Sequence, residues 1–119
     1  MAELPIYEQI RASLENDILE GIIREGEPVP STNRLAEYYK INPATAAKGV
    51  SLLHDDGLLE KRRGLGLYLA EGARDALLER RRAGFRAKFV DAMLSEAARL
   101  GISHRDVIAM VAAASSGGG

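Results

Sequence analysis

The chain contains no cysteine and no tryptophan, and only two of its 119 residues are histidines. Without cysteine, a disulfide framework and a thiolate metal site are both excluded. His54 and His104 lie in different segments, and neither has carboxylates around it at the spacing of metal ligands, so no metal is predicted. No nucleophile–base arrangement and no phosphate-binding loop is visible. We therefore expect neither an enzyme nor a bound cofactor.

Long apolar runs are also lacking. No uncharged stretch approaches the ~20 residues that a membrane span needs, and the first residues lack the basic-then-apolar order of a signal peptide. Hydrophobic residues make up 46% of the chain and charged residues 28%, a balance typical of globular domains. We therefore expect a soluble, cytoplasmic protein whose residues 115–119, which have nothing to bury, form a flexible tail.

The chain also lacks a net positive charge. Its net charge is −1, which argues weakly against a nucleic-acid partner. Its distribution is more informative. Residues 1–40 carry four basic and eight acidic side chains, whereas residues 58–70 carry three basic and one acidic. The three basic residues are consecutive, Lys61, Arg62 and Arg63. A charge run is usually a solvated face, so only its place in a motif can give it a function.

The apolar pattern predicts three helices in the first half of the chain. Isoleucine or leucine recurs every fourth residue from Ile6 to Ile22, which predicts an amphipathic helix over residues 5–22. Ser31 is a suitable N-cap for a short helix that ends near residue 39. Asn42 and Pro43 are an N-cap and a first-turn proline for a third helix that ends near residue 56.

A change of period follows. Residues 58–70 alternate around Gly64 and Gly66, which predicts a β-hairpin with a glycine-permitted turn. Only two or three residues join the second and third helices. The order is that of a helix-turn-helix followed by a wing, so the fold class is mainly α with a small β-hairpin.

The remainder reads as two helices, over residues 73–100 and 104–114, with Gly101 as a stop and Ser103 with Asp106 as a weak capping box. We expect residues 1–71 to form the winged helix-turn-helix and residues 72–114 a helical dimerisation segment. The apolar stripe of that segment has little to cover within one chain. The expected dimer contacts are Leu78, Phe85, Phe89, Met93, Ala97, Leu100, Val107 and Val111.

Four stretches together resemble the N-terminal domain of GntR-family regulators. They are Pro-Ser-Thr-Asn-Arg-Leu-Ala at residues 30–36, Ile-Asn-Pro-Ala-Thr at 41–45, Gly-Leu-Leu at 57–59 and Arg-Gly-Leu-Gly-Leu-Tyr-Leu at 63–69. The Asn-Pro-x-Thr start of the third helix and the short C-terminal segment are similar to the YtrA-like subfamily. The resemblance implies a homodimeric repressor of double-stranded operator DNA, often at a transporter operon. The operator and any small-molecule effector stay unidentified.

A helix-turn-helix reads DNA with the amino end of its recognition helix, and basic wing residues with glycines suit a close approach to the minor groove. The family resemblance adds contacts at the start of the second helix. The expected DNA contacts are Ser31, Thr32, Asn33, Arg34, Pro43, Ala44, Thr45, Lys48, Lys61, Arg62, Arg63, Gly64 and Gly66.

Several of these residues have two interpretations. Capping alone explains Ser31, Asn42 and Pro43, although the Ser31 hydroxyl can also meet a phosphate. Asn33 stands where the family usually has arginine, so Asn33 can read adenine while Arg34 meets phosphate. Lys48 is either a solvated lysine or a contact to phosphate or guanine.

Lys40 replaces the glycine that this family commonly has in the helix-turn-helix turn. A non-glycine residue there costs on the order of 1 kcal/mol and predicts a slightly reshaped turn. Arg80, Arg81 and Arg82 are either a solvated helix face or a contact to the DNA backbone. Two other functions stay open: a protein-interaction module, and the excised DNA-binding half of a larger regulator.

Overall fold

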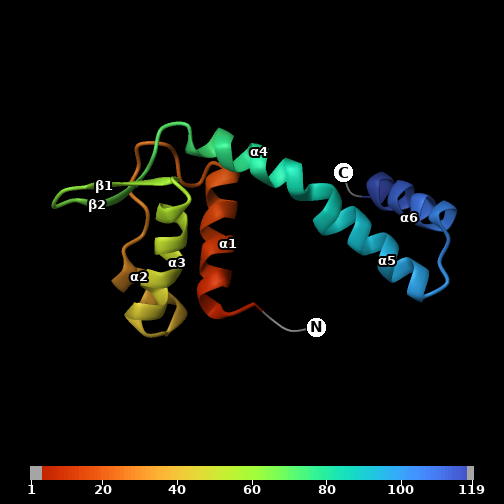
Figure 1. Ribbon diagram of the computed structural model, residues 1–119, viewed down its shortest axis with the longest axis horizontal. Helices are drawn as coiled ribbons and strands as arrows, with labels where there is room; N and C mark the ends of the chain where they lie inside the picture. The colour runs from red at the N-terminus through yellow and green to blue at the C-terminus, as the bar shows by residue number, and fades with distance from the viewer. Residues whose placement is uncertain (1–3, 118–119) are drawn as a thin grey trace. The chain divides into compact units, whose positions relative to one another are not determined.

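The computed structural model describes residues 4–117, which form two compact units, one up to Glu79 and one from Arg80 onward (Figure 1). The first unit contains α1 (Ile6–Leu19), α2 (Thr32–Tyr39), α3 (Pro43–Asp55), β1 (Leu59–Arg62), β2 (Gly66–Leu69) and the start of α4 (Ala73–Phe85). The second contains the rest of α4, the π-helical segment η1 (Arg86–Asp91), α5 (Ala92–Arg99) and α6 (His104–Gly117). The predicted fold class, mainly helical with one two-stranded antiparallel hairpin, is confirmed.

The first helix is shorter than predicted. It ends at Leu19 rather than residue 22, because Gly21 adopts a φ of 80° and the chain leaves the helix there. The N–H of Gly21 donates to the Ile18 carbonyl, and the N–H of Ile22 donates to the Asp17 carbonyl, which is the Schellman pattern of a helix end. Ile22 therefore lies outside the helix and is 65% exposed.

Helices α1, α2 and α3 enclose the core of the first unit. The inner stripe of α3, which is Ala46, Gly49, Val50 and Leu53, is buried. A Cβ built on Gly49 would lie 2.8 Å from the Tyr7 carbonyl oxygen. Glycine at this position therefore allows α1 and α3 to approach more closely than a side chain would permit.

The helix-turn-helix follows its predicted caps. The Ser31 hydroxyl accepts the Arg34 N–H at 3.1 Å, and the Asn42 side-chain oxygen accepts the Ala44 N–H at 2.7 Å. Lys40 adopts the left-handed conformation itself, with φ 57° and ψ 51°. The N–H groups of Lys40 and Ile41 bond to carbonyls of α2, and the reshaping expected from a non-glycine residue stays a prediction.

The wing is tied to the loop that precedes α2. Strands β1 and β2 pair in register from Leu59↔Leu69 to Arg62↔Gly66. Residues 26–29 run along the other edge of β2, where the N–H groups of Gly26 and Val29 donate to β2 carbonyls. The N–H of Leu69 donates back to the Glu27 carbonyl at 2.9 Å. These backbone bonds connect the hairpin to the segment that leads into Ser31.

The boundary between the two parts lies eight residues later than predicted, after Glu79 rather than after residue 71. The reason is packing, because Ala73 and Leu77 on α4 are buried in the core of the first unit. The guanidinium of Arg74 also donates to the Leu19 carbonyl at 2.9 Å, at the open end of α1. The first turns of α4 thus belong to the winged helix-turn-helix.

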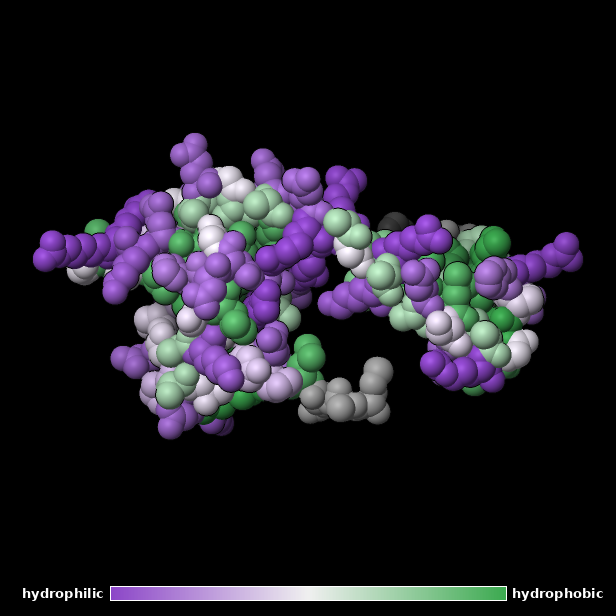
Figure 2. Space-filling view, viewed as in Figure 1, coloured by the Kyte–Doolittle hydropathy of each residue, from purple (hydrophilic) through white to green (hydrophobic). Residues whose placement is uncertain are grey.

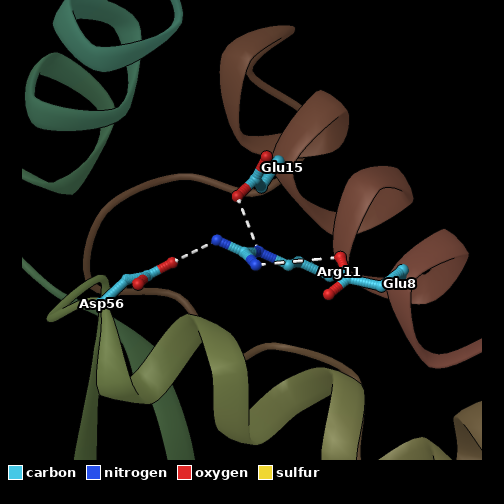
Figure 3. A network of polar contacts seen from close by, with 4 residues as sticks. All are labelled: Glu8, Arg11, Glu15 and Asp56. Atoms are coloured by element: carbon cyan, nitrogen blue, oxygen red, sulfur yellow. Dashed lines mark hydrogen bonds and ion pairs between the residues drawn. The ribbon is translucent and has the colours of Figure 1, made fainter.

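One ion-pair cluster joins α1 to the carboxyl end of α3 (Figure 3). The Arg11 guanidinium lies 2.8 Å from Asp56, 3.4 Å from Glu15 and 3.8 Å from Glu8. Partial burial lowers the pKa of Arg11, but the attraction of these three carboxylates outweighs it, so the pKa is raised above its usual range. The cluster holds the end of α3 beside α1 and gives the half-buried guanidinium its partners.

The second unit departs from its prediction in two ways. The helix expected over residues 73–100 contains the π-helical segment η1, which a 3.6-residue apolar pattern cannot reveal. The last helix continues to Gly117, three residues into the expected tail, while residues 118–119 lie outside the described residues. Gly101, with φ 72°, and the Ser103 cap of the Asp106 N–H are as predicted.

No helix among residues 4–117 is both long enough and apolar enough to cross a membrane.

Because Leu77 is completely buried, we expect Leu77→Ala to lower the free energy of unfolding by about 2–5 kcal/mol. Chemical denaturation of the full chain measures this change. Ile22→Ala is the matched control, since it removes as many atoms from an exposed side chain and should cost less than about 0.5 kcal/mol. Equal losses in the two variants would contradict the assignment of α4 to the N-terminal core.

Candidate nucleic-acid interface

The amino end of α2 presents small polar groups. Ser31 is exposed, and although its oxygen caps the Arg34 N–H, the hydroxyl proton remains to donate to a phosphate. The two interpretations of Ser31 are therefore compatible. Thr32 is half-buried, and Asn33 and Arg34 are both exposed.

Asn33 and Arg34 are separated by one helical step, so their side chains leave α2 in different directions. Arg34 lines a groove of about 330 Å³ between α1 and α2, together with Asp17 and Tyr38. Asn33 does not line it. The structure thus directs Arg34 toward α1 and leaves Asn33 as the more outward amide of the pair.

Helix α3 presents its amino end and one largely uncharged face. Pro43 and Ala44 are exposed and Thr45 is half-buried. Opposite the buried stripe, the helical period places Ala44, Lys48 and Ser51 on the outer face. Ser51 is exposed and was missed by sequence reasoning, although the same period that identified the inner stripe indicates it.

Lys48 is not a freely solvated lysine. Its ammonium nitrogen lies 3.9 Å from the centroid of the Tyr7 ring on α1. A cation over an aromatic face at an exposed site contributes about 0.5–1 kcal/mol. The contact orders the side chain and leaves its N–H donors available to a further anion.

The three basic residues of the wing divide into two kinds. The Nε and Nη2 atoms of Arg62 both lie 3.0 Å from one oxygen of Glu60, and its Cζ lies 4.1 Å from the centroid of Tyr68. Because side chains alternate along a strand, Glu60 and Arg62 share one face of β1, and Tyr68 is the direct partner of Glu60. Lys61 lies on the opposite face and is exposed, as is Arg63 at the turn.

The wing tip and the amino end of α2 line one cavity of about 220 Å³. Its walls are Val29, Pro30, Ser31, Thr32, Val50, Leu65, Gly66 and Leu67. Of the predicted DNA contacts, the structure therefore brings Ser31 and Thr32 together with Gly66. The residues at the amino end of α3 do not line this cavity, to which α3 contributes only Val50.

Four further residues of this surface were not predicted from the sequence, namely Tyr7, Glu60, Leu65 and Tyr68. The strand period indicates Glu60 as a neighbour of Arg62, but the pairing register that adds Tyr68 comes from the structure. Nothing local indicates that Tyr7 lies under Lys48, since the two residues are joined only by the packing of α1 on α3.

Among the described residues, no three histidine, aspartate or glutamate side chains are grouped so as to hold a metal ion.

Comparison with known proteins shows which family the chain resembles. The model described as "Bacterial regulatory proteins, gntR family" matches residues 6–69. The HTH-type transcriptional repressor YtrA of Bacillus subtilis is 39% identical over 75 residues, which are 63% of this chain and 58% of that protein. The match thus spans less than two thirds of the curated relative.

Two solved structures are also similar. A GntR family transcriptional regulator from Listeria monocytogenes is 26% identical with a TM-score of 0.75, and the alignment covers 93% of this chain and 96% of that one. The DNA-binding domain of AraR, in a complex with operator ORR3, is 28% identical with a TM-score of 0.55, covering 58% of this chain and 83% of that one.

The two kinds of wing cation should differ in their effect on stability. We expect Arg62→Ala to lower the free energy of unfolding by about 0.5–1 kcal/mol, because it removes the contacts to Glu60 and Tyr68. Lys61→Ala and Arg63→Ala should change it by less than about 0.5 kcal/mol. Urea denaturation of the three variants measures this, and a loss on Lys61→Ala as large as that on Arg62→Ala would refute the division.

Proposed function

Because the chain belongs to the gntR family of bacterial regulatory proteins, we propose that it is a cytoplasmic transcription regulator that binds double-stranded operator DNA through its first unit. One observation carries the proposal. The wing tip lines the same cavity as the amino end of α2, so one surface offers phosphate-binding groups beside a basic hairpin. The operator complex of the similar AraR domain supports it.

Each element has a distinct part in this proposal. Helix α3 enters the major groove, where Thr45 meets a phosphate or a thymine methyl and Lys48 reaches a phosphate or a guanine. Ser31 and Thr32 donate to phosphates at the amino end of α2. Asn33 reads adenine through its amide, and Arg34 is the phosphate contact of the pair.

The wing supplies the minor-groove part of the interface. Gly64 and Gly66 let its backbone come close to the sugars, and the exposed cations Lys61 and Arg63 are attracted by the negative potential of the groove. Arg62 contributes mainly to the hairpin itself, since Glu60 and Tyr68 hold its guanidinium. DNA affinity should therefore depend on Lys61 and Arg63 more than on Arg62.

The proposed function is tested by titrating a fluorescent duplex, selected from a random library, at several salt concentrations. With on the order of 6–10 phosphate contacts in a dimer, affinity should fall by roughly 10³ or more between 50 and 200 mM salt. Joint replacement of Lys61 and Arg63 by alanine should weaken binding and flatten the salt dependence, whereas Arg62→Ala should change both less. A salt-independent affinity, or none, would favour the protein-interaction alternative.

We further propose that the second unit pairs two chains. Among residues 80–114 of this unit only Ala97 and Val107 are buried, so its core is too small to be stable alone. These two residues, expected at the dimer interface, are largely buried within the unit, and both also line one of its apolar grooves. The exposed large apolar side chains are Phe85, Phe89, Met93, Leu100, Ile108, Met110 and Val111.

A second copy of the chain is the natural cover for this surface. Two apolar grooves, of about 430 and 360 Å³, are lined from α5 and α6, and they share Met93, Val107 and Val111. Packing a copy there would extend the small core of the unit. A two-fold dimer places two recognition helices about one helical turn apart on DNA, so the operator should be a near-palindrome. The dimer would repress by occluding a promoter, and the family resemblance indicates a transporter operon.

Pairing is tested by sedimentation of Leu100→Glu, which places a charge on a 64%-exposed apolar side chain of the second unit. We expect the variant to be monomeric at concentrations where the unmodified chain is dimeric, and to bind the palindrome roughly 10²–10⁴-fold more weakly because the second half-site contact is no longer intramolecular.

The matched control is Ile22→Glu, because Ile22 is equally exposed but lies in the first unit. It should leave both the mass and the affinity unchanged. A Leu100→Glu chain that stays dimeric, or a monomer that binds the full palindrome as tightly as the unmodified chain, would rule out this role for the second unit.

A further inference from the structure

Leu65 is an apolar side chain at the tip of the wing, and it is 68% exposed. It belongs to the tight turn of the hairpin, where its N–H donates to the Arg62 carbonyl at 2.9 Å. Gly64 and Gly66 flank it with φ angles of 77° and 101°. The fold does not need this leucine for its core, because most of its surface is open to solvent.

Leu65 lies on a definite side of the wing. Leu65 lines the cavity that also contains Ser31 and Thr32, so it faces the side of the wing nearest the amino end of α2. Arg62 and Tyr68 form their contact on the other face of the hairpin. Leu65 thus lies on the same side as the proposed phosphate contacts.

We propose that Leu65 is a specificity-determining residue that enters the minor groove and selects base pairs without a 2-amino group. The inference rests on the proposed function, because it assigns a role within the DNA complex. Leu65 would contact the floor of the groove, while Lys61 and Arg63 hold the wing against the phosphates on either side.

The reason is the chemistry of the groove floor. A·T pairs present only the adenine N3 and thymine O2 acceptors there, whereas a G·C pair adds the guanine N2 amino group, which projects into the groove. A leucine side chain cannot accept a hydrogen bond, so it would both collide with this amino group and leave its N–H unpaired. Apolar side chains inserted from the minor groove are an established way for proteins to contact DNA.

The glycines on either side make the approach geometrically feasible. Cβ atoms built on Gly64 and Gly66 would meet no other atom within 4 Å, so neither glycine is required by packing in the free protein. Their positive φ angles shape the turn, and because neither carries a side chain, Leu65 has the one side chain within residues 64–66. A close fit of the tip to the groove therefore depends on Leu65 itself.

The test uses a duplex selected from a random library by the full chain. Each base pair under the wing is then prepared in three forms, A·T, G·C and inosine·C. Inosine presents the same major-groove edge as guanine but has no 2-amino group, so it separates reading of the minor groove from reading of the major groove. We expect A·T and inosine·C to bind alike, and G·C to bind roughly tenfold to a hundredfold more weakly at one or more of these pairs.

Two variants of Leu65 test whether this residue causes the discrimination against G·C pairs. Leu65→Asn places an amide oxygen of similar reach at the tip, which can accept from the guanine amino group, so the discrimination should fall to roughly the small factor that groove shape alone supplies. Leu65→Met keeps an apolar side chain and should retain it. Ile22→Asn is the matched control for an exposed apolar side chain away from the wing, and it should retain the full discrimination.

The outcomes separate the two proposals. If no duplex is selected, the proposed function fails and the role of Leu65 fails with it. If a duplex is bound in a salt-dependent way but inosine·C binds as weakly as G·C, DNA binding stands and the minor-groove role of Leu65 is overturned. An unchanged discrimination in Leu65→Asn, or an equal loss in Ile22→Asn, overturns it as well.

Discussion

The pairing of residues 26–29 with β2 is the constraint on which the proposed interface depends. Three backbone hydrogen bonds fix the loop before α2 against the hairpin, and Pro30 and Ser31 follow directly. Without them the wing would be a two-stranded ribbon joined to the helices only at its base, and such ribbons are marginally stable alone. With them, the cap of α2 and the wing tip lie across one cavity.

Figure 2 shows polar side chains over much of this view of the molecule, interrupted by apolar side chains.

Local chemistry made much of the first unit predictable. Ser31 and Asn42 are N-caps whose hydrogen bonds depend on neighbours within five positions, so these bonds were predictable. Gly21 also acts on close neighbours, but its role as the stop of α1 was recognised only from the structure. The alternation around Gly64 and Gly66 predicted the hairpin because that signal is also local in the sequence. The limit of α1 was misjudged because Ile22 continues the apolar period beyond the point where Gly21 ends the helix.

What the sequence could not predict depends on contacts between distant segments. The place of Leu77 in the core required knowing that α4 begins beside the end of α1, where Arg74 reaches the Leu19 carbonyl. The engagement of Lys48 by Tyr7 required the packing of α1 on α3. The different surroundings of Arg62 and of its neighbours Lys61 and Arg63 were partly predictable, because the strand period places Glu60 on the same face as Arg62. The run of three cations by itself does not distinguish them.

The small core of the second unit has a consequence for how the protein would respond to its own abundance. When two chains complete each other's core, assembly and folding of those helices become one equilibrium that depends on concentration. While monomers predominate, the pool of paired regulator would grow with the square of the number of chains, so operator occupancy would change more steeply than synthesis does. A regulator that bound its operator as a single chain would lack that steepness, and at low occupancy its binding would rise in simple proportion to its expression.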